Sequence, residues 1–106
     1  MATVDEQMEQ RMDRASILAA RARLPENVVY RAFVYETVVL NLQSGKYHGL
    51  NQVGGRMLET LQSSDTVGEA AAKLADEFSQ PLERIEDDLC SFCTNLHERG
   101  LITLGA

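Results

Sequence analysis

The sequence has few of the features that mark enzymes, membrane proteins and nucleic-acid-binding proteins. Its 106 residues include only two histidines and two cysteines. It contains no Gly-x-Ser-x-Gly turn and no glycine-rich phosphate loop with Lys-Ser or Lys-Thr. No apolar run approaches the roughly 20 residues of a membrane span. The first ten residues are polar and acidic, which is unlike a secretory signal. We therefore expect one cytoplasmic, non-catalytic domain with no cofactor, no metal and no membrane partner.

The chain also lacks an excess of positive charge. The formal net charge is −6 at pH 7. Acidic and basic side chains cancel within residues 1–24, so the whole excess lies on residues 25–106. An acidic domain repels phosphate backbones, so we expect no nucleic-acid partner.

Residues 5–24 predict a helix, because this stretch is rich in helix formers and contains neither glycine nor proline. Pro25 closes the segment, since the residue before a proline is disfavoured in a helix. The apolar stripe is thin, which indicates a frayed or partner-dependent helix. We therefore divide the chain into an extension, 1–24, that is helical or partly disordered, and a domain, 25–106. The stripe consists of Met8, Met12, Ala15, Ala19 and Ala22.

Residues 28–50 predict an antiparallel meander of three strands. The stretches VVYRAFV and TVVLNLQ are rich in β-branched and aromatic residues, and the second shows a two-residue alternation. Gln43-Ser44-Gly45 supplies a turn in which glycine can take a positive φ. KYHGL then reads as a short third strand.

Three helices are predicted after the meander. Asn51 can cap the first, Thr66 and Glu69 form a capping box for the second, and Pro81 suits the first turn of the third. Gly100 is placed to end the third helix, and a short apolar tail follows it.

The order of these elements predicts an α+β fold, with helices covering one face of the sheet. Gly54-Gly55 weakens the first helix, and we interpret the pair as a place where another backbone passes close.

Several short motifs, taken together, resemble the PqqD-like domains, which are recognition elements for the leader segments of ribosomally made and modified peptides. The turn glycine Gly45 is followed by Tyr47, and Leu50-Asn51 opens a helix. A Thr-Val-x-Glu-Ala helix begins at Thr66, and the last helix ends in a Leu-x-x-x-Gly-Leu-Ile run over 96–102. The resemblance covers roughly residues 25–104.

The resemblance implies a winged-helix-like fold that holds a precursor peptide for a modifying enzyme, such as a leader peptidase or a radical-SAM enzyme. Lasso-peptide and quinone-cofactor biosynthesis both use such domains. It also implies that the leader adds as a strand to the edge of the third strand, with side chains in a groove beside the third helix. An edge strand offers unpaired backbone groups to any extended peptide. The edge residues are Lys46, Tyr47, His48, Gly49 and Leu50.

The third helix has two adjacent faces, and we assign one mainly to the core and the other mainly to the groove. Leu89 can serve both faces, and burial of the cysteines as core fillers is the alternative for the second face. Tyr47 has the same two possibilities. The core face holds Ile85, Leu89, Phe92 and Leu96, and the groove face holds Leu82, Glu86, Cys90, Cys93 and His97. An acidic first turn is formed by Glu83, Glu86, Asp87 and Asp88, which either face solvent or meet a basic leader residue.

Other functions fit less well. Cys90, Cys93 and His97 supply only three local ligands for zinc, and a redox thiol pair belongs at a helix N-terminus rather than after four carboxylates. A winged helix can bind DNA through its third helix, but residues 81–99 carry a net charge of −3. An assembly module that docks on an enzyme without binding a leader stays open. An exposed edge strand also permits a homodimer through residues 28–50.

Overall fold

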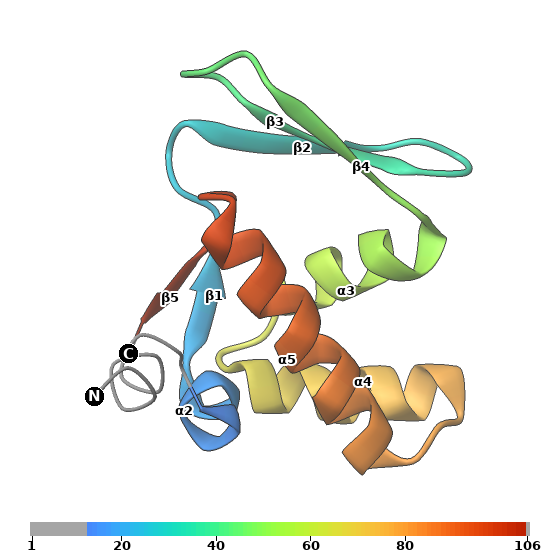
Figure 1. Ribbon diagram of the computed structural model, residues 1–106. Coiled ribbons are helices and arrows are strands. Elements are labelled where there is room, and N and C mark those ends of the chain that lie inside the picture. Colours follow the sequence, from blue (N-terminus) through green and yellow to red (C-terminus); the bar gives the residue numbers. More distant parts are fainter. Residues whose placement is uncertain (1–12, 106) are drawn as a thin grey trace, which may run out of the picture.

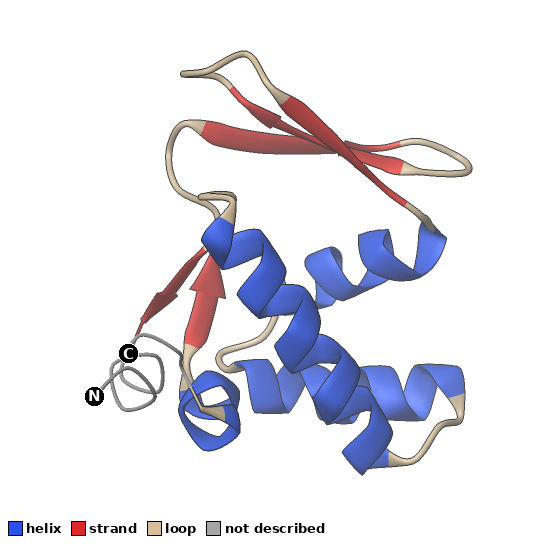
Figure 2. Cartoon of the chain, viewed as in Figure 1, coloured by secondary structure: helices blue, strands red, loops and turns tan. Residues whose placement is uncertain are grey.

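The computed structural model describes residues 13–105, and it confirms the α+β architecture. A three-stranded antiparallel sheet lies at one end of the molecule, and the helices pack below it (Figures 1 and 2). The elements in chain order are α2 (Arg14–Ala19), β1 (Arg21–Arg23), β2 (Val28–Ala32), β3 (Thr37–Asn41), β4 (Tyr47–Leu50), α3 (Gln52–Gln62), α4 (Val67–Phe78), α5 (Leu82–Glu98) and β5 (Thr103–Gly105).

The meander forms as the sequence predicts, in the order β2-β3-β4. Strand β3 pairs with β4 in the register Thr37↔Leu50 and Leu40↔Tyr47. The turn between them uses Gly45 at φ +76°, a conformation that glycine adopts without a steric penalty. Thr37 and Val39 are buried against the helices, so the face of β3 that carries these alternate residues points toward the core.

The predicted helix boundaries follow from their caps. The Asn51 side chain accepts a hydrogen bond of 2.8 Å from the Gly54 amide, and the Thr66 hydroxyl accepts one of 3.0 Å from the Glu69 amide. The Glu69 carboxylate in turn accepts from the Asp65 amide at 3.0 Å. Helix α5 begins directly after its N-cap Pro81 and ends before Gly100, whose φ is +73°.

The expected helix over 5–24 is wrong at its C-terminal end. The helix α2 spans only Arg14–Ala19, and Arg21–Arg23 forms strand β1. Strand β1 pairs antiparallel with β5, which begins at the end of the predicted apolar tail, in the register Arg21↔Gly105. The paired residues are 80 to 84 positions apart in the sequence, and this pairing overrides the local helix preference. No local pattern reveals such a distant partner. The part of the expected helix before residue 13 lies outside the described residues.

Residues 14–23 contribute side chains to the same core as the rest of the chain. Ile17 is 3% exposed and Ala22 is 1% exposed. They join a cluster that α3, α4 and α5 build with the underside of the sheet. The fully buried centre of this cluster includes Val39, Leu58, Leu61, Leu74 and Leu89.

The glycine pair of α3 approaches side chains rather than another backbone. A Cβ atom at Gly55 would lie 2.4 Å from the Thr37 Oγ1 atom, and one at Gly54 would lie 3.2 Å from the Leu50 Cβ atom. The two glycines therefore let the start of α3 sit against β3 and the end of β4. Within residues 13–105, no helix is both long and apolar enough to cross a membrane.

Candidate functional site

Strand β4 is an edge strand, and this makes its outer side the first candidate site. It pairs with β3 on one side only, and no other described strand lies against it. Tyr47 is 70% exposed, whereas His48 and Leu50 are half-buried. The His48 Nδ1 atom lies 3.4 Å from a guanidinium nitrogen of Arg99, which follows α5. The edge is thus open and adjoins the C-terminal end of α5.

A groove of about 470 Å³ lies beside this edge, between β4, the start of α3 and helix α5. The strand contributes Gly49 and Leu50. The face of α5 that lines it repeats at spacings of three and four residues, as neighbours on a helix surface do. Its members are Asp88, Ser91, Phe92, Asn95 and Leu96, and α3 adds Val53, Gly54 and Met57.

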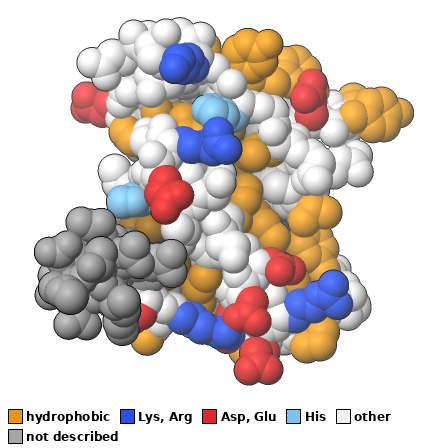
Figure 3. Space-filling view, in the orientation of Figure 1, with side chains coloured by type: hydrophobic (Ala, Val, Ile, Leu, Met, Phe, Trp, Pro, Cys, Tyr) orange, Lys and Arg blue, Asp and Glu red, His pale blue; other side chains and the backbone are white. Residues whose placement is uncertain are grey.

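The groove is apolar inside and has one charged side chain. Leu50, Met57 and Phe92 supply hydrophobic surface, and Ser91 and Asn95 are neutral. Asp88 is the sole charged residue among those that line it. The space-filling view shows hydrophobic side chains exposed between the sheet end of the molecule and the helices below it (Figure 3). The arrangement suits an extended segment with at least one apolar side chain.

The structure places the predicted cysteines in the core rather than in the groove. Cys93 is 0% exposed and Cys90 is 9% exposed, and both are free thiols. Burial raises the pKa of the Cys93 thiol to about 12 and also raises the pKa of the Cys90 thiol. Buried, protonated thiols are unsuited to nucleophilic or redox work.

The reason for this burial is helix α2, which covers the face of α5 that the sequence left free. Arg14 of α2 pairs with Glu86 at 2.8 Å and also with Asp87. One of its guanidinium nitrogens additionally donates to the Glu83 carbonyl oxygen at 3.3 Å. Because α2 contacts this face of α5, the predicted groove wall of Cys90 and Cys93 lies inside the protein.

The other residues assigned to the groove face of α5 are not brought together with β4. Leu89 is 0% exposed and belongs to the core alone, whereas Leu82 is 46% exposed at the opposite end of the helix. His97 is exposed, but it is not part of the groove lining. Among residues 13–105, no three His, Cys, Asp or Glu side chains gather as a metal site requires. Of the predicted edge, Gly49 and Leu50 line the groove.

Sequence reasoning missed Ser91 and Asn95 as groove residues and assigned Phe92 to the core. Phe92 is half-buried, so it contributes both to the core and to the groove. A signal was present: Asp88, Ser91 and Asn95 form a polar stripe beside the apolar face. The stripe alone does not distinguish a groove wall from a solvated face.

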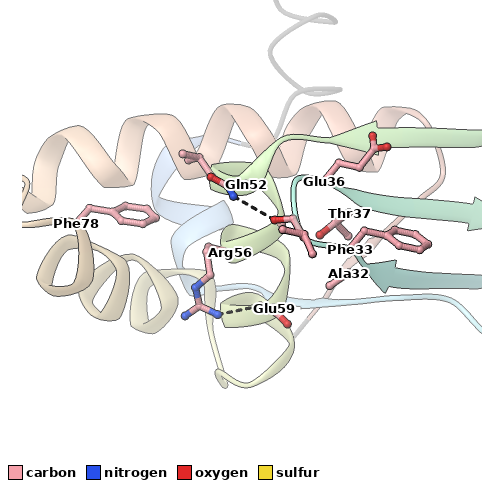
Figure 4. Close-up of a pocket in the computed structure, with 11 residues that line it drawn as sticks. Ala32, Phe33, Glu36, Thr37, Gln52, Arg56, Glu59 and Phe78 are labelled. Atoms are coloured by element: carbon pink, nitrogen blue, oxygen red, sulfur yellow. Dashed lines mark hydrogen bonds and ion pairs between the residues drawn. The ribbon is translucent and has the colours of Figure 1, made fainter.

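A second hollow, of about 430 Å³, lies between the β2–β3 hairpin, α3 and the end of α4 (Figure 4). Phe33 and Phe78 stand on opposite sides of it, and the Gln52 side chain donates to the Val34 carbonyl oxygen at 3.1 Å. The hairpin tip is strongly apolar, with Val34 at 77% and Tyr35 at 80% exposure. This surface is separate from the edge of β4, although Val53 borders both hollows.

Ion pairs at the rim of this second hollow join one guanidinium to two carboxylates. The Arg56 guanidinium donates to Glu77 at 2.6 and 2.8 Å and to Glu59 at 2.8 Å. Arg56 holds the pKa of the Glu77 carboxyl below its usual value. The exposed apolar side chains of the hairpin tip are therefore the feature of this surface that suits contact with another protein.

Comparison with known proteins gives the class to which this architecture belongs. The family model of coenzyme PQQ synthesis protein D (PqqD) matches residues 36–102. The chain therefore belongs to the PqqD family, as its motifs indicated.

Two solved structures are similar to the chain over most of their length. One, TbiB1 in complex with the TbiA(beta) leader peptide, is 30% identical with a TM-score of 0.70, over 76% of this chain and 93% of that chain. The other, a lasso peptide synthetase B1 complexed with the leader peptide, is 25% identical with a TM-score of 0.71, over 79% of this chain and 99% of that chain. Among curated proteins no match was found.

Proposed function

We propose that this protein binds the leader segment of a ribosomally made precursor peptide and presents it to a modifying enzyme. The observation that carries the proposal is the open edge of β4 beside an apolar groove on α5. Two similar structures are complexes with leader peptides, which supports the same kind of ligand here. Lasso-peptide biosynthesis is therefore the setting that we favour.

Binding of this kind divides affinity and selectivity between backbone and side chains. The leader pairs with the amides and carbonyls of Lys46–Leu50. This pairing contributes affinity but does not discriminate between sequences, because every peptide carries these groups. Its alternate side chains point toward α5 and enter the groove, where Leu50, Met57 and Phe92 bury apolar surface. The α5 contacts that we propose are thus Asp88, Ser91, Phe92 and Asn95 rather than the cysteine face.

The domain itself performs no covalent step in this proposal. Holding the leader raises the effective concentration of the attached core peptide at the active site of the modifying enzyme, such as a leader peptidase. The enzyme needs a docking surface that leaves the groove free. The apolar hairpin tip, with Phe33, Val34 and Tyr35, is the surface that we propose for it.

A titration tests the proposal. The purified protein is mixed with the synthetic leader segment of the precursor peptide encoded beside its gene, and amide shifts are followed by NMR. We expect saturable binding with shifts centred on residues 46–50 and 88–96. Saturable binding centred elsewhere would refute the site. Absence of binding would favour an assembly module that docks on an enzyme without recognising a leader.

A further inference from the structure

The acidic residues at the start of α5 do not share one environment. Glu86 and Asp87 both pair with Arg14 of α2, which offsets one of their two negative charges on the side away from the groove. Asp88 has no ion-pair partner among residues 13–105. Its helical position turns it to the opposite side, where it lines the groove with Ser91 and Phe92.

Asp88 is exposed and lies beside the apolar part of the groove, so a bound peptide can reach its carboxylate. No other groove-lining side chain carries a charge, and Leu50, Met57 and Phe92 give the groove an apolar wall. A carboxylate beside a low-dielectric wall is screened less than one in open water. The net charge of −6 adds a weak attraction for cationic segments.

We propose that Asp88 selects leader segments carrying a lysine or arginine two positions from an apolar residue that fills the groove. This inference rests on the proposed leader binding. Side chains on the same face of an extended peptide are about 6.6 Å apart. Asp88 and Phe92 are separated by one helical turn, about 6 Å along the axis. An apolar side chain against Phe92 thus places the next side chain of that face beside Asp88.

The test is a selection from a displayed library of random 12-residue peptides on the immobilised full-length protein. The same library is selected on Asp88→Lys and on Asp76→Lys. Asp76 lies exposed on α4 without an ion pair among the described residues, so Asp76→Lys makes the same change of net charge away from the groove. Selected peptides are then titrated against each protein, and their contact with β4 is checked from amide shifts.

We expect the wild type and Asp76→Lys to enrich a lysine or arginine at a fixed spacing from an apolar residue. The Asp88→Lys variant should lose this preference and bind the selected cationic peptides about three- to tenfold more weakly, as loss of a partly exposed ion pair and its replacement by repulsion require. Peptides that contact β4 with no cationic preference, or with the same preference on Asp88→Lys, overturn the inference but leave the proposed function standing. A selection that yields no peptide on β4 overturns both.

Discussion

Replacing Gly54 with alanine should weaken leader binding without unfolding the domain. The new methyl group would lie on the groove floor, 3.2 Å from the Leu50 Cβ atom and 3.6 Å from the Phe92 Cε1 atom. The Leu50 Cβ atom moves only with its backbone, so a shift of a few tenths of an ångström at the end of β4 must relieve this contact. The helix gains up to about 1 kcal/mol when alanine replaces glycine. This gain offsets the tight contact, so the free energy of unfolding should stay within about 1 kcal/mol of wild type.

The loss of binding follows from the volume that the methyl group takes from the ligand. An extra methyl in a packed apolar site costs about 1–3 kcal/mol. The Kd for the leader peptide should therefore rise about five- to 150-fold. Isothermal titration calorimetry with the leader segment measures this change, and urea denaturation followed by circular dichroism measures the stability.

Gly55→Ala is the matched control, because it makes the same substitution one residue further along α3. Its methyl group would lie 2.4 Å from the Thr37 Oγ1 atom, and Thr37 is 4% exposed. This variant should lose about 1–3 kcal/mol of stability. It should bind the leader nearly as wild type under conditions where it is folded, because Gly55 does not line the β4–α5 groove. A stable Gly54→Ala variant with wild-type affinity would refute the placement of leader side chains on this floor.

Three further predictions concern the core, the first helix and the hairpin. The free energy of unfolding should fall as pH rises from about 9 toward 12. The reason is that an unfolded thiol ionises at a pH of about 8.5, whereas burial raises the pKa of Cys93 to about 12. Urea denaturation at several pH values should show a shallower decline for Cys93→Ala. Ile17→Ala should cost about 2–4 kcal/mol in the same assay, because Ile17 is 3% exposed. A Val34→Ser, Tyr35→Ser double variant should keep its leader affinity but slow modification of the precursor by the partner enzyme in a reconstituted assay.

Each of these predictions has an outcome that contradicts it. Equal pH slopes for Cys93→Ala and wild type would mean that the thiol does not keep its proton in the fold. Ile17→Ala should be compared with Ser16→Ala on the exposed side of α2. Equal stability of the two variants would mean that α2 does not pack into the core. Wild-type turnover by the hairpin variant would remove the hairpin tip from the proposed enzyme contact.

The meander and the three later helices could be predicted because their signals are local. Caps at Asn51 and Thr66, the turn at Gly45 and the stop at Gly100 depend on neighbouring residues only. Strand β1 could not be predicted, since three residues of ordinary helix preference gain their strand partner from the far end of the chain.

The β4 edge of the candidate site could be predicted from the sequence, but the α5 wall opposite it could not. Strand order makes β4 an edge, and this follows from the meander itself. The side of α5 that faces β4 depends on what covers the other side. Arg14 and Ile17 of α2 provide that cover, and neither belongs to the apolar stripe that the sequence predicts for this segment. The cysteines therefore looked as suitable for the groove as Ser91 and Asn95.

The short ladder between β1 and β5 has a consequence for how this domain can be joined to other proteins. Arg21 lies opposite Gly105, so the last described strand ends beside the segment that directly follows α2. Neither strand borders the groove beside β4. A linker attached after β5 would therefore tether the unit without crossing the proposed peptide site.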